Sequence, residues 1–529
     1  MSVFFGGLPN PPYVGSNNDI RPEAFPAGEY EAMVTAAAAG NVEQVRMFLD
    51  AGVYVDSLGN MRDTSLIAAT LSNQIPVVQL LLDRGARVNV MDEQGETALF
   101  VACGHNFIEI VRLLLHNNAD MNRRCNVARN TALMIAIENN HTDMANALLD
   151  NGAAVGLRNA NGETELYIAC EQGNVGIVER LLDAGVDKEL ARNGGDTPLI
   201  GASFYNKIKV VATLLHRGAY VDSSNELGDT ALMVAAAKNH VKTMKMLLAR
   251  GANVDLMNVH GETALSLACV QQHKNIVKLL LDHGANLEFK YGALGETVLM
   301  RVVQYSNDET LLQVILDHNP QISTQNRRGE TVVHMACDHP LEYDEFLYRV
   351  LEKDDSAMDI ADNEGRTPLM RACGANSWDK VEMLIENGAR VDVESTDGET
   401  ALTLAARKNE KYSLIETILD AHAEQMDVQS TGTGYTALMA AASRGQLGQV
   451  RVLLNRGAKI DLQSKANMTA LMMASEKGHL EVVRLLLGHG ANAGLVDAEG
   501  RTALDLASSN GHGDVAALLR GEDDDMSSS

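Results

Sequence analysis

The chain has 529 residues, of which 46% are hydrophobic and only 4% aromatic, and it carries a formal net charge of −26. This acidic balance argues against a nucleic-acid-binding protein, because such proteins present a basic face to the phosphates. No apolar run approaches the roughly 20 residues that span a bilayer, so we expect no membrane insertion.

The two ends of the chain differ in composition from everything between them. Residues 1–28 hold five of the ten prolines and lack the basic start and apolar core of a secretory signal, which predicts an extended N-terminal arm. Residues 521–529 combine acidic residues with three serines and predict a solvated tail. Residues 29–520 form the body of the protein.

Threonines recur through this body with a spacing that is 33 residues in most steps. A fixed period of this length is the signature of a solenoid, in which each repeat packs only on its neighbours. The series is Thr64, Thr97, Thr131, Thr164, Thr197, Thr230, Thr263, Thr297, Thr331, Thr367, Thr400, Thr436, Thr469 and Thr502.

Residues 469–492 illustrate one repeat. Thr469 stands where a helix N-cap belongs and is followed by a short helix with one apolar face. Gly478 indicates a tight turn, and residues 480–487 have the apolar pattern of a second helix, which Gly490 ends. Neither helix is long enough to persist alone, so we expect stacked helix–turn–helix units joined by projecting hairpin loops.

This pattern resembles the ankyrin-repeat family, whose T-P-L-H-x-A motif it follows in stretches such as Thr230-Ala-Leu-Met-Val-Ala235. The resemblance covers residues 29–520, about fifteen repeats, and residues 31–56 form a degenerate first repeat without the threonine. It implies an all-α ankyrin-repeat solenoid. The motif's histidine remains only at His334 and is often replaced by methionine, which predicts the loss of a hydrogen-bonding side chain from most repeats.

The spacing becomes irregular between residues 297 and 436. Steps of 34 and 36 residues occur there, Asn319-Pro320 replaces the closing Gly-Ala, and the only tryptophan, Trp378, lies in the same stretch. Two interpretations stay open. The segment is either a run of drifted repeats, or a hinge or specialised docking surface, because aromatic residues and insertions are common at interaction hot spots.

No catalytic, metal-binding or cofactor-binding motif is found. The sequence lacks a P-loop, Cys-x-x-Cys and HExxH, and Gly432-x-Gly434 precedes a helix without the strand that a dinucleotide site needs. His141, His240, His479 and His512 fall at turns between helices, where a structural role is expected. Five of the six cysteines occupy one buried repeat position, which predicts reduced thiols and a cytoplasmic protein, with the nucleus as the alternative.

An acidic residue before the capping threonine recurs, although the repeat does not require one. The residue before the capping threonine is acidic in nine of fourteen repeats, and we call these nine residues the acidic row. They are Asp63, Glu96, Glu163, Asp196, Asp229, Glu262, Glu296, Glu330 and Glu399. An acid beside a helix N-terminus is favourable for local reasons. Alternatively, the row attracts a basic or extended basic segment of a partner.

These observations favour a non-enzymatic scaffold or adaptor that binds partner proteins on the concave surface that the resemblance implies. The candidate partner-binding residues are the acidic row together with Tyr305, Trp378 and Tyr435. The alternatives are a regulatory or substrate-targeting subunit of a kinase, phosphatase or ubiquitin ligase complex, and a structural component of a cytoskeletal assembly. No oligomeric state follows from the sequence.

Overall fold

The structure is a computed structural model that describes residues 27–59, 63–306, 308–338, 345–407 and 413–522. Most of the expected N-terminal arm and most of the C-terminal tail therefore lie outside the described residues. The helix α1 begins at Ala27, so the last two residues of the expected arm are helical. The final helix ends at Arg520, where the repeats were expected to end.

The described residues contain thirty α-helices, one 3-10 turn and no named strand, and the helices form fifteen consecutive pairs. The first helices of the pairs, which we call inner helices, are α1 Ala27–Ala38, α3 Ser65–Leu71, α5 Ala98–Gly104, α7 Ala132–Glu138, α9 Glu165–Gln172, α11 Pro198–Phe204, α13 Ala231–Ala237, α15 Ala264–Val270, α17 Val298–Tyr305, α19 Val332–Asp338, α21 Pro368–Ala375, α23 Ala401–Ala406, α25 Ala437–Ser443, α27 Ala470–Glu476 and α29 Ala503–Ser509. The outer helices are α2 Val42–Asp50, α4 Ile75–Asp83, α6 Ile108–His116, α8 Thr142–Asp150, α10 Val175–Asp183, α12 Ile208–His216, α14 Val241–Ala249, α16 Lys274–Asp282, α18 Glu309–Leu316, α20 Glu345–Lys353, α22 Trp378–Glu386, α24 Ser413–Ala421, α26 Leu447–Asn455, α28 Leu480–Gly488 and α30 Gly513–Arg520.

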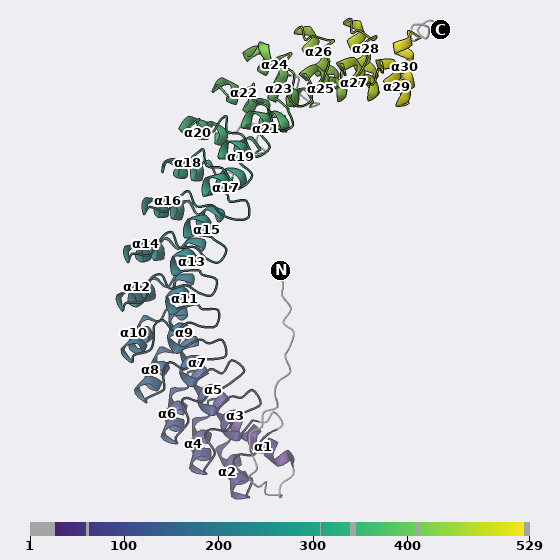
Figure 1. The fold of residues 1–529 in the computed structure, drawn as a ribbon. Helices are drawn as coiled ribbons and strands as arrows, with labels where there is room; N and C mark the ends of the chain where they lie inside the picture. The colour runs from purple at the N-terminus through teal and green to yellow at the C-terminus, as the bar shows by residue number, and fades with distance from the viewer. Residues whose placement is uncertain (1–26, 60–62, 307, 339–344, 408–412, 523–529) are drawn as a thin grey trace. The chain divides into compact units, whose positions relative to one another are not determined.

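The chain divides into two compact units, residues 1–193 and 194–529. Within each unit the inner helices stack side by side, the outer helices form a second layer, and the hairpin loops project beside the inner helices (Figure 1). The inner helices and hairpins together form what we call the inner-helix face of each unit. The expected all-α fold of stacked helical pairs is therefore confirmed.

The recurring threonines are helix caps, as the sequence predicts. Thr230 has extended backbone angles, and its hydroxyl accepts a hydrogen bond from the Met233 N–H at 3.3 Å. Every threonine of the series except Thr331 makes this bond to the third residue of its helix. Each cap satisfies a backbone donor that the short helix cannot satisfy itself.

The motif's histidine position keeps a hydrogen-bond acceptor in several repeats that have lost the histidine. His334 Nδ1 accepts from the Thr331 N–H at 3.1 Å, so its Nε2 carries the proton and donates to the Arg366 carbonyl at 3.0 Å. The Met134 sulfur accepts from the Thr131 N–H at 3.5 Å in the same way. The expected loss of this hydrogen bond is therefore incomplete, because a thioether is also a weak acceptor.

Histidines at the turns join successive repeats. His240 Nδ1 lies 2.9 Å from the Ser203 carbonyl, and His512 Nε2 lies 3.0 Å from the Glu476 carbonyl. Each of these carbonyls belongs to the last turn of the inner helix in the preceding repeat, where carbonyls lack the helical donor four residues later. The structural role predicted for the turn histidines is therefore confirmed for these positions, and His141 and His479 make equivalent contacts.

The repeat that contains α22 has no such histidine. Ser377 stands in its place and makes no side-chain cap. Lys380, one turn later, is buried, and its Nζ donates to the carbonyls of Ala336 at 2.9 Å and Cys337 at 3.2 Å. A lysine therefore takes over the contact between repeats in the irregular part of the chain. In that same part, Asn319 replaces the closing glycine and adopts a left-handed backbone with φ 54°.

All six cysteines are buried and none forms a disulfide. Burial raises the pKa of the Cys269 and Cys373 thiols to about 12, so neither is a thiolate at neutral pH. This agrees with the small apolar role that the sequence predicts for them.

Candidate partner-binding surface

The acidic row lies at the base of the hairpins, directly before the inner helices, and the hairpins themselves bind several of its carboxylates. In the hairpin before α15, Asn258 accepts from the Glu262 N–H at 2.9 Å and donates to the Glu262 carboxylate at 3.3 Å. Asn326 binds Glu330 in the same way, with 2.8 Å from Nδ2 to Oε2. The amide four residues earlier therefore closes the loop onto the acidic residue.

The same amides also connect one repeat to the previous one. Asn225 donates to the Asp196 carboxylate at 2.9 Å, and Asn258 donates to the Asp229 carboxylate at 2.9 Å. Because Asn258 binds both Asp229 and Glu262, it joins two members of the acidic row. These carboxylates consequently contribute to the contact between hairpins.

In two repeats the charge in this position is matched to the residue four places earlier. Asp362 and Asp497 stand where other repeats have asparagine, and the position before the threonine is then arginine, whereas Asp92 is followed by Glu96, whose N–H donates to it at 2.8 Å. Arg366 pairs with Asp362 at 3.3 Å, and Arg501 pairs with Asp497 at 2.9 Å. An amide can donate to a carboxylate, whereas a carboxylate requires a donor opposite it. Several members of the acidic row are thus halves of a local pair, which favours the local interpretation of their acidity.

The remaining members of the row are also constrained. Glu163 lies 3.8 Å from Arg192, Glu330 also pairs with Arg371, and Glu399 pairs with Arg407. Burial is the main cause that raises the pKa of Asp63, Glu96 and Glu296, and nearby carboxylates raise it further. Within the described residues, Glu296 Oε1 is buried without a hydrogen-bond partner. The row as a partner-binding ladder stays a prediction.

The structure places the three aromatic candidates in different surroundings. Tyr305, the last residue of the inner helix α17, is 65% exposed and lines a small pocket of about 100 Å³ with Val270 and Arg301. Trp378 begins the outer helix α22 and donates from Nε1 to the Thr417 hydroxyl at 2.9 Å. Trp378 therefore packs between outer helices and does not lie on the same face as Tyr305.

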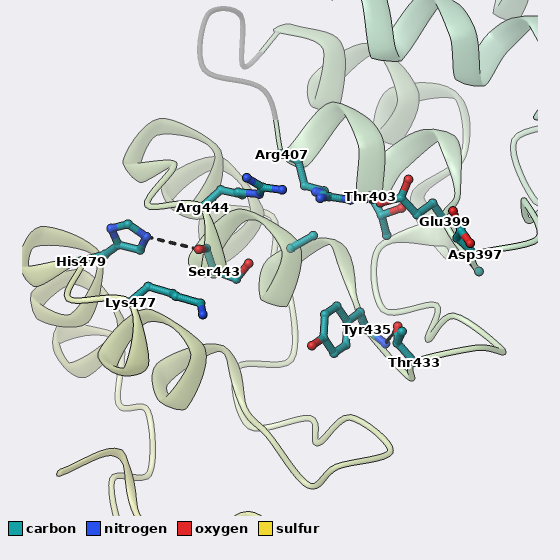
Figure 2. Close-up of a pocket in the computed structure, with 12 residues that line it drawn as sticks. Asp397, Glu399, Thr403, Arg407, Thr433, Tyr435, Ser443, Arg444, Lys477 and His479 are labelled. Carbon is teal, nitrogen blue, oxygen red and sulfur yellow. Dashed lines mark hydrogen bonds and ion pairs between the residues drawn. The ribbon is translucent and has the colours of Figure 1, made fainter. Parts of the chain in front are cut away.

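Tyr435 is 37% exposed and lines a second, larger hollow in the unit formed by residues 194–529 (Figure 2). This hollow has a volume of about 880 Å³ and lies along the inner-helix face between α23 and α27. The structure therefore brings Tyr435 together with Glu399 of the acidic row, and neither with Trp378.

The sequence did not single out a set of apolar side chains on the inner-helix face. Phe204, Tyr205 and Val270 are 41%, 44% and 49% exposed at the ends of α11 and α15, on the face that also carries Tyr305. The Lys238 ammonium lies 4.6 Å from the centre of the Phe204 ring. These exposed side chains could have been found from the sequence. The residue that ends each inner helix lies at a nearly fixed distance after the capping threonine, so an apolar residue at that position could have been recognised.

The described residues contain no cluster of three histidine, cysteine or acidic side chains that could hold a metal ion. None of the helices that the structure describes is long and apolar enough to cross a bilayer.

A family model of ankyrin repeats, described as three copies, matches seven segments of the chain: residues 14–92, 87–159, 133–225, 218–291, 299–395, 381–464 and 457–528. These matches run through almost the whole length, and the chain belongs to the ankyrin-repeat family. Ankyrin repeats are in general protein-interaction modules, so a general protein-binding role follows from the family.

Curated relatives match only part of the chain. Human neurogenic locus notch homolog protein 1 is 35% identical over 140 residues, which are 26% of this chain and 5% of that protein. The B-cell lymphoma 3 protein homolog of mouse is 28% identical over 145 residues, which are 27% of this chain and 32% of that protein. This chain therefore spans a small fraction of the length of both relatives.

Among solved structures, the ankyrin repeat domain of human ASB11 matches with 28% sequence identity and a TM-score of 0.37. The match covers 42% of this chain and 98% of the ASB11 domain.

Proposed function

We propose that this protein is a non-enzymatic scaffold or adaptor that binds segments of partner proteins on the inner-helix face of residues 194–529. The observation that carries the proposal is the row of exposed apolar side chains Phe204, Tyr205, Val270 and Tyr305 at the ends of inner helices. Aromatic residues dominate binding energy at protein interfaces, because they offer a large apolar area with few rotatable bonds.

The charges around these side chains support a partner of a particular kind. Asp196, Asp229 and Glu262 lie at the base of the hairpins on the same face, and the whole chain carries a net charge of −26. The carboxylates of Asp229 and Glu262 bind neighbouring amides, which carry no charge, so their negative charge remains. An extended partner segment with apolar side chains and some basic residues fits this surface best.

A matched pair of tyrosines tests the proposal. Tyr305 on the inner helix α17 is 65% exposed, and Tyr348 on the outer helix α20 is 49% exposed. The full-length protein and the variants Tyr305→Ala, Tyr205→Ala with Tyr305→Ala, and Tyr348→Ala would each be used to capture partners from the same extract. Quantitative mass spectrometry would measure how much of each specifically bound protein is retained.

We expect the double variant to retain roughly a tenth or less of its main partner, since two hot-spot aromatics are each worth about 1–2 kcal/mol or more. Tyr348→Ala should retain as much as the unmodified protein. Equal retention by all variants would contradict the proposal, as would a loss confined to Tyr348→Ala.

We also propose that the protein resides in a reducing compartment, and that this compartment is the cytoplasm. The six cysteines are buried and none forms a disulfide, which supports this placement because disulfides form mainly in oxidising compartments. Fluorescent tagging and microscopy would test it, and secretion of the tagged chain would contradict it.

A further inference from the structure

The hollow between α23 and α27 on the inner-helix face is lined by several basic side chains, which is unexpected in so acidic a chain. Its lining includes Arg407, Arg444 and Lys477, which follow the last residues of α23, α25 and α27 in three successive repeats. Asp397 and Glu399 lie across the hollow, on the hairpin side (Figure 2). We call this hollow the basic groove.

The three cations differ in how far the protein itself neutralises them. Arg407 is half-buried and pairs with Glu399. Lys477 is exposed and lies 3.8 Å from the carboxylate of the adjacent Glu476. Arg444 is exposed, and no carboxylate in the described parts of the chain lies within ion-pair distance of it. Arg444 is therefore available to an anion from outside.

The cations also repel one another. Burial is the first cause that lowers the pKa of Arg407, and the positive charge of Arg444 is the second. A cation at the end of a helix is favourable for local reasons, which accounts for one cation per helix. It does not account for a large hollow in which two guanidinium groups face each other across adjacent repeats. An anionic group bound between them would relieve their repulsion.

We propose that the basic groove binds an acidic segment of a partner protein, with one of its carboxylates paired to Arg444. This inference rests on the proposed function, since it assumes that the inner-helix face binds protein segments. Tyr435 and Ser443 also line the groove, and their hydroxyls supply hydrogen bonds for a peptide backbone. Asp397 and Glu399 repel anions on the hairpin side, so the acidic side chain of the segment is expected at the helix ends, beside Arg444.

The high negative charge of the protein makes the binding of an acidic probe informative. A chain with net charge −26 repels anions in general, so an acidic peptide binds only where cations are concentrated. The probe is a fluorescently labelled peptide of six glutamates, with a peptide of six glutamines as its neutral counterpart. Fluorescence anisotropy at low salt measures the affinity of the full-length protein for each.

Arg451 provides a matched control. It is an exposed arginine on the outer helix α26 and does not line the groove. Arg444→Glu and Arg451→Glu change the net charge equally, so a difference between them reports the location of the binding site. Circular dichroism of each variant checks the fold, and Arg444→Gln replaces Arg444→Glu if the charge reversal prevents folding.

We expect the glutamate peptide to bind at least about tenfold more tightly than the glutamine peptide, and Arg444→Glu to abolish most of that difference. Arg451→Glu should change the affinity by no more than about twofold. Equal losses in both variants, or no measurable binding of the glutamate peptide, would overturn the inference. Tighter binding of a single-stranded oligonucleotide than of the peptide would also overturn it.

This outcome is separable from that of the proposed function. If the glutamate peptide does not bind while the tyrosine variants still lose their partner, only the proposed role of the basic groove is refuted. If the tyrosine variants keep their partner, the proposed function fails irrespective of the peptide.

Discussion

Replacing Lys380 should show whether a buried lysine can substitute for a turn histidine. Lys380 is 1% exposed, and its Nζ makes two hydrogen bonds, at 2.9 Å and 3.2 Å, to the carbonyls of Ala336 and Cys337 near the end of α19. In the repeat of α16 the corresponding position is the buried Ile276, and His273 binds the carbonyl of the preceding inner helix at 3.0 Å. The lysine therefore supplies a contact that other repeats obtain from histidine.

The expected cost follows from these two bonds. Lys380→Met keeps much of the volume but leaves both carbonyls without this donor, at about 1–3 kcal/mol per unsatisfied group. Avoiding the burial of an ammonium group offsets part of that cost. We expect a net loss of about 2 kcal/mol in the free energy of unfolding for Lys380→Met, and about 4 kcal/mol for Lys380→Ala, which adds a cavity.

The only tryptophan of the chain gives a local readout. Trp378 is the first residue of α22, the helix that contains Lys380, and its indole donates to Thr417 at 2.9 Å. Urea unfolding followed by tryptophan fluorescence therefore reports on this repeat. Adding Ser377→His to Lys380→Met should restore most of the lost stability. A Lys380→Met variant as stable as the unmodified protein, or no rescue by the histidine, would refute the reasoning.

Three further changes test local features of the repeats, all by urea unfolding followed by circular dichroism. Burial raises the pKa of Glu165 from 4.5 to about 7, so the folded chain holds this proton more tightly than the unfolded one, and stability should fall as pH rises from 4.5 to 7. This fall should amount to at most about 3 kcal/mol, and Glu165→Gln should remove it. A Glu165→Gln variant with the same pH profile of stability as the unmodified protein would count against the prediction. Thr230→Ala should cost about 1 kcal/mol because the cap of α13 is lost, whereas Thr230→Ser should cost less than half of that. Arg366→Glu should cost about 2 kcal/mol because it places a second carboxylate beside the buried Asp362, and adding Asp362→Asn should recover the loss.

The repeat itself could be predicted from the sequence because its signals are local. The capping threonines, the turn residues with left-handed backbone such as Gly478, and the apolar faces all act within a few residues. A fixed period then places each element without long-range information. This is why the fold and the caps were predictable along almost the whole chain.

The contacts between repeats were harder to predict, because they join residues that lie a whole repeat or more apart in the sequence. Nothing local in the sequence shows that Lys380 reaches the carbonyls of the preceding repeat, or that Asn258 binds Asp229. The acidic row was visible, but the pairing of members such as Glu262 and Glu330 with an asparagine four places earlier was not recognised. The basic groove was missed because Arg407 and Arg444 are 37 positions apart, although both follow the last residue of an inner helix.

The central claim is that partner proteins bind the inner-helix face, and site-specific cross-linking tests it most directly. A photoreactive phenylalanine analogue would be placed at Tyr305 in one sample and at Tyr348 in another, and the samples would be irradiated in cells and analysed by mass spectrometry. Both side chains are exposed, the first at the end of α17 and the second on the outer helix α20. We predict specific protein adducts at position 305 and few at position 348. Adducts concentrated at position 348, or equally frequent at both positions, would contradict the account.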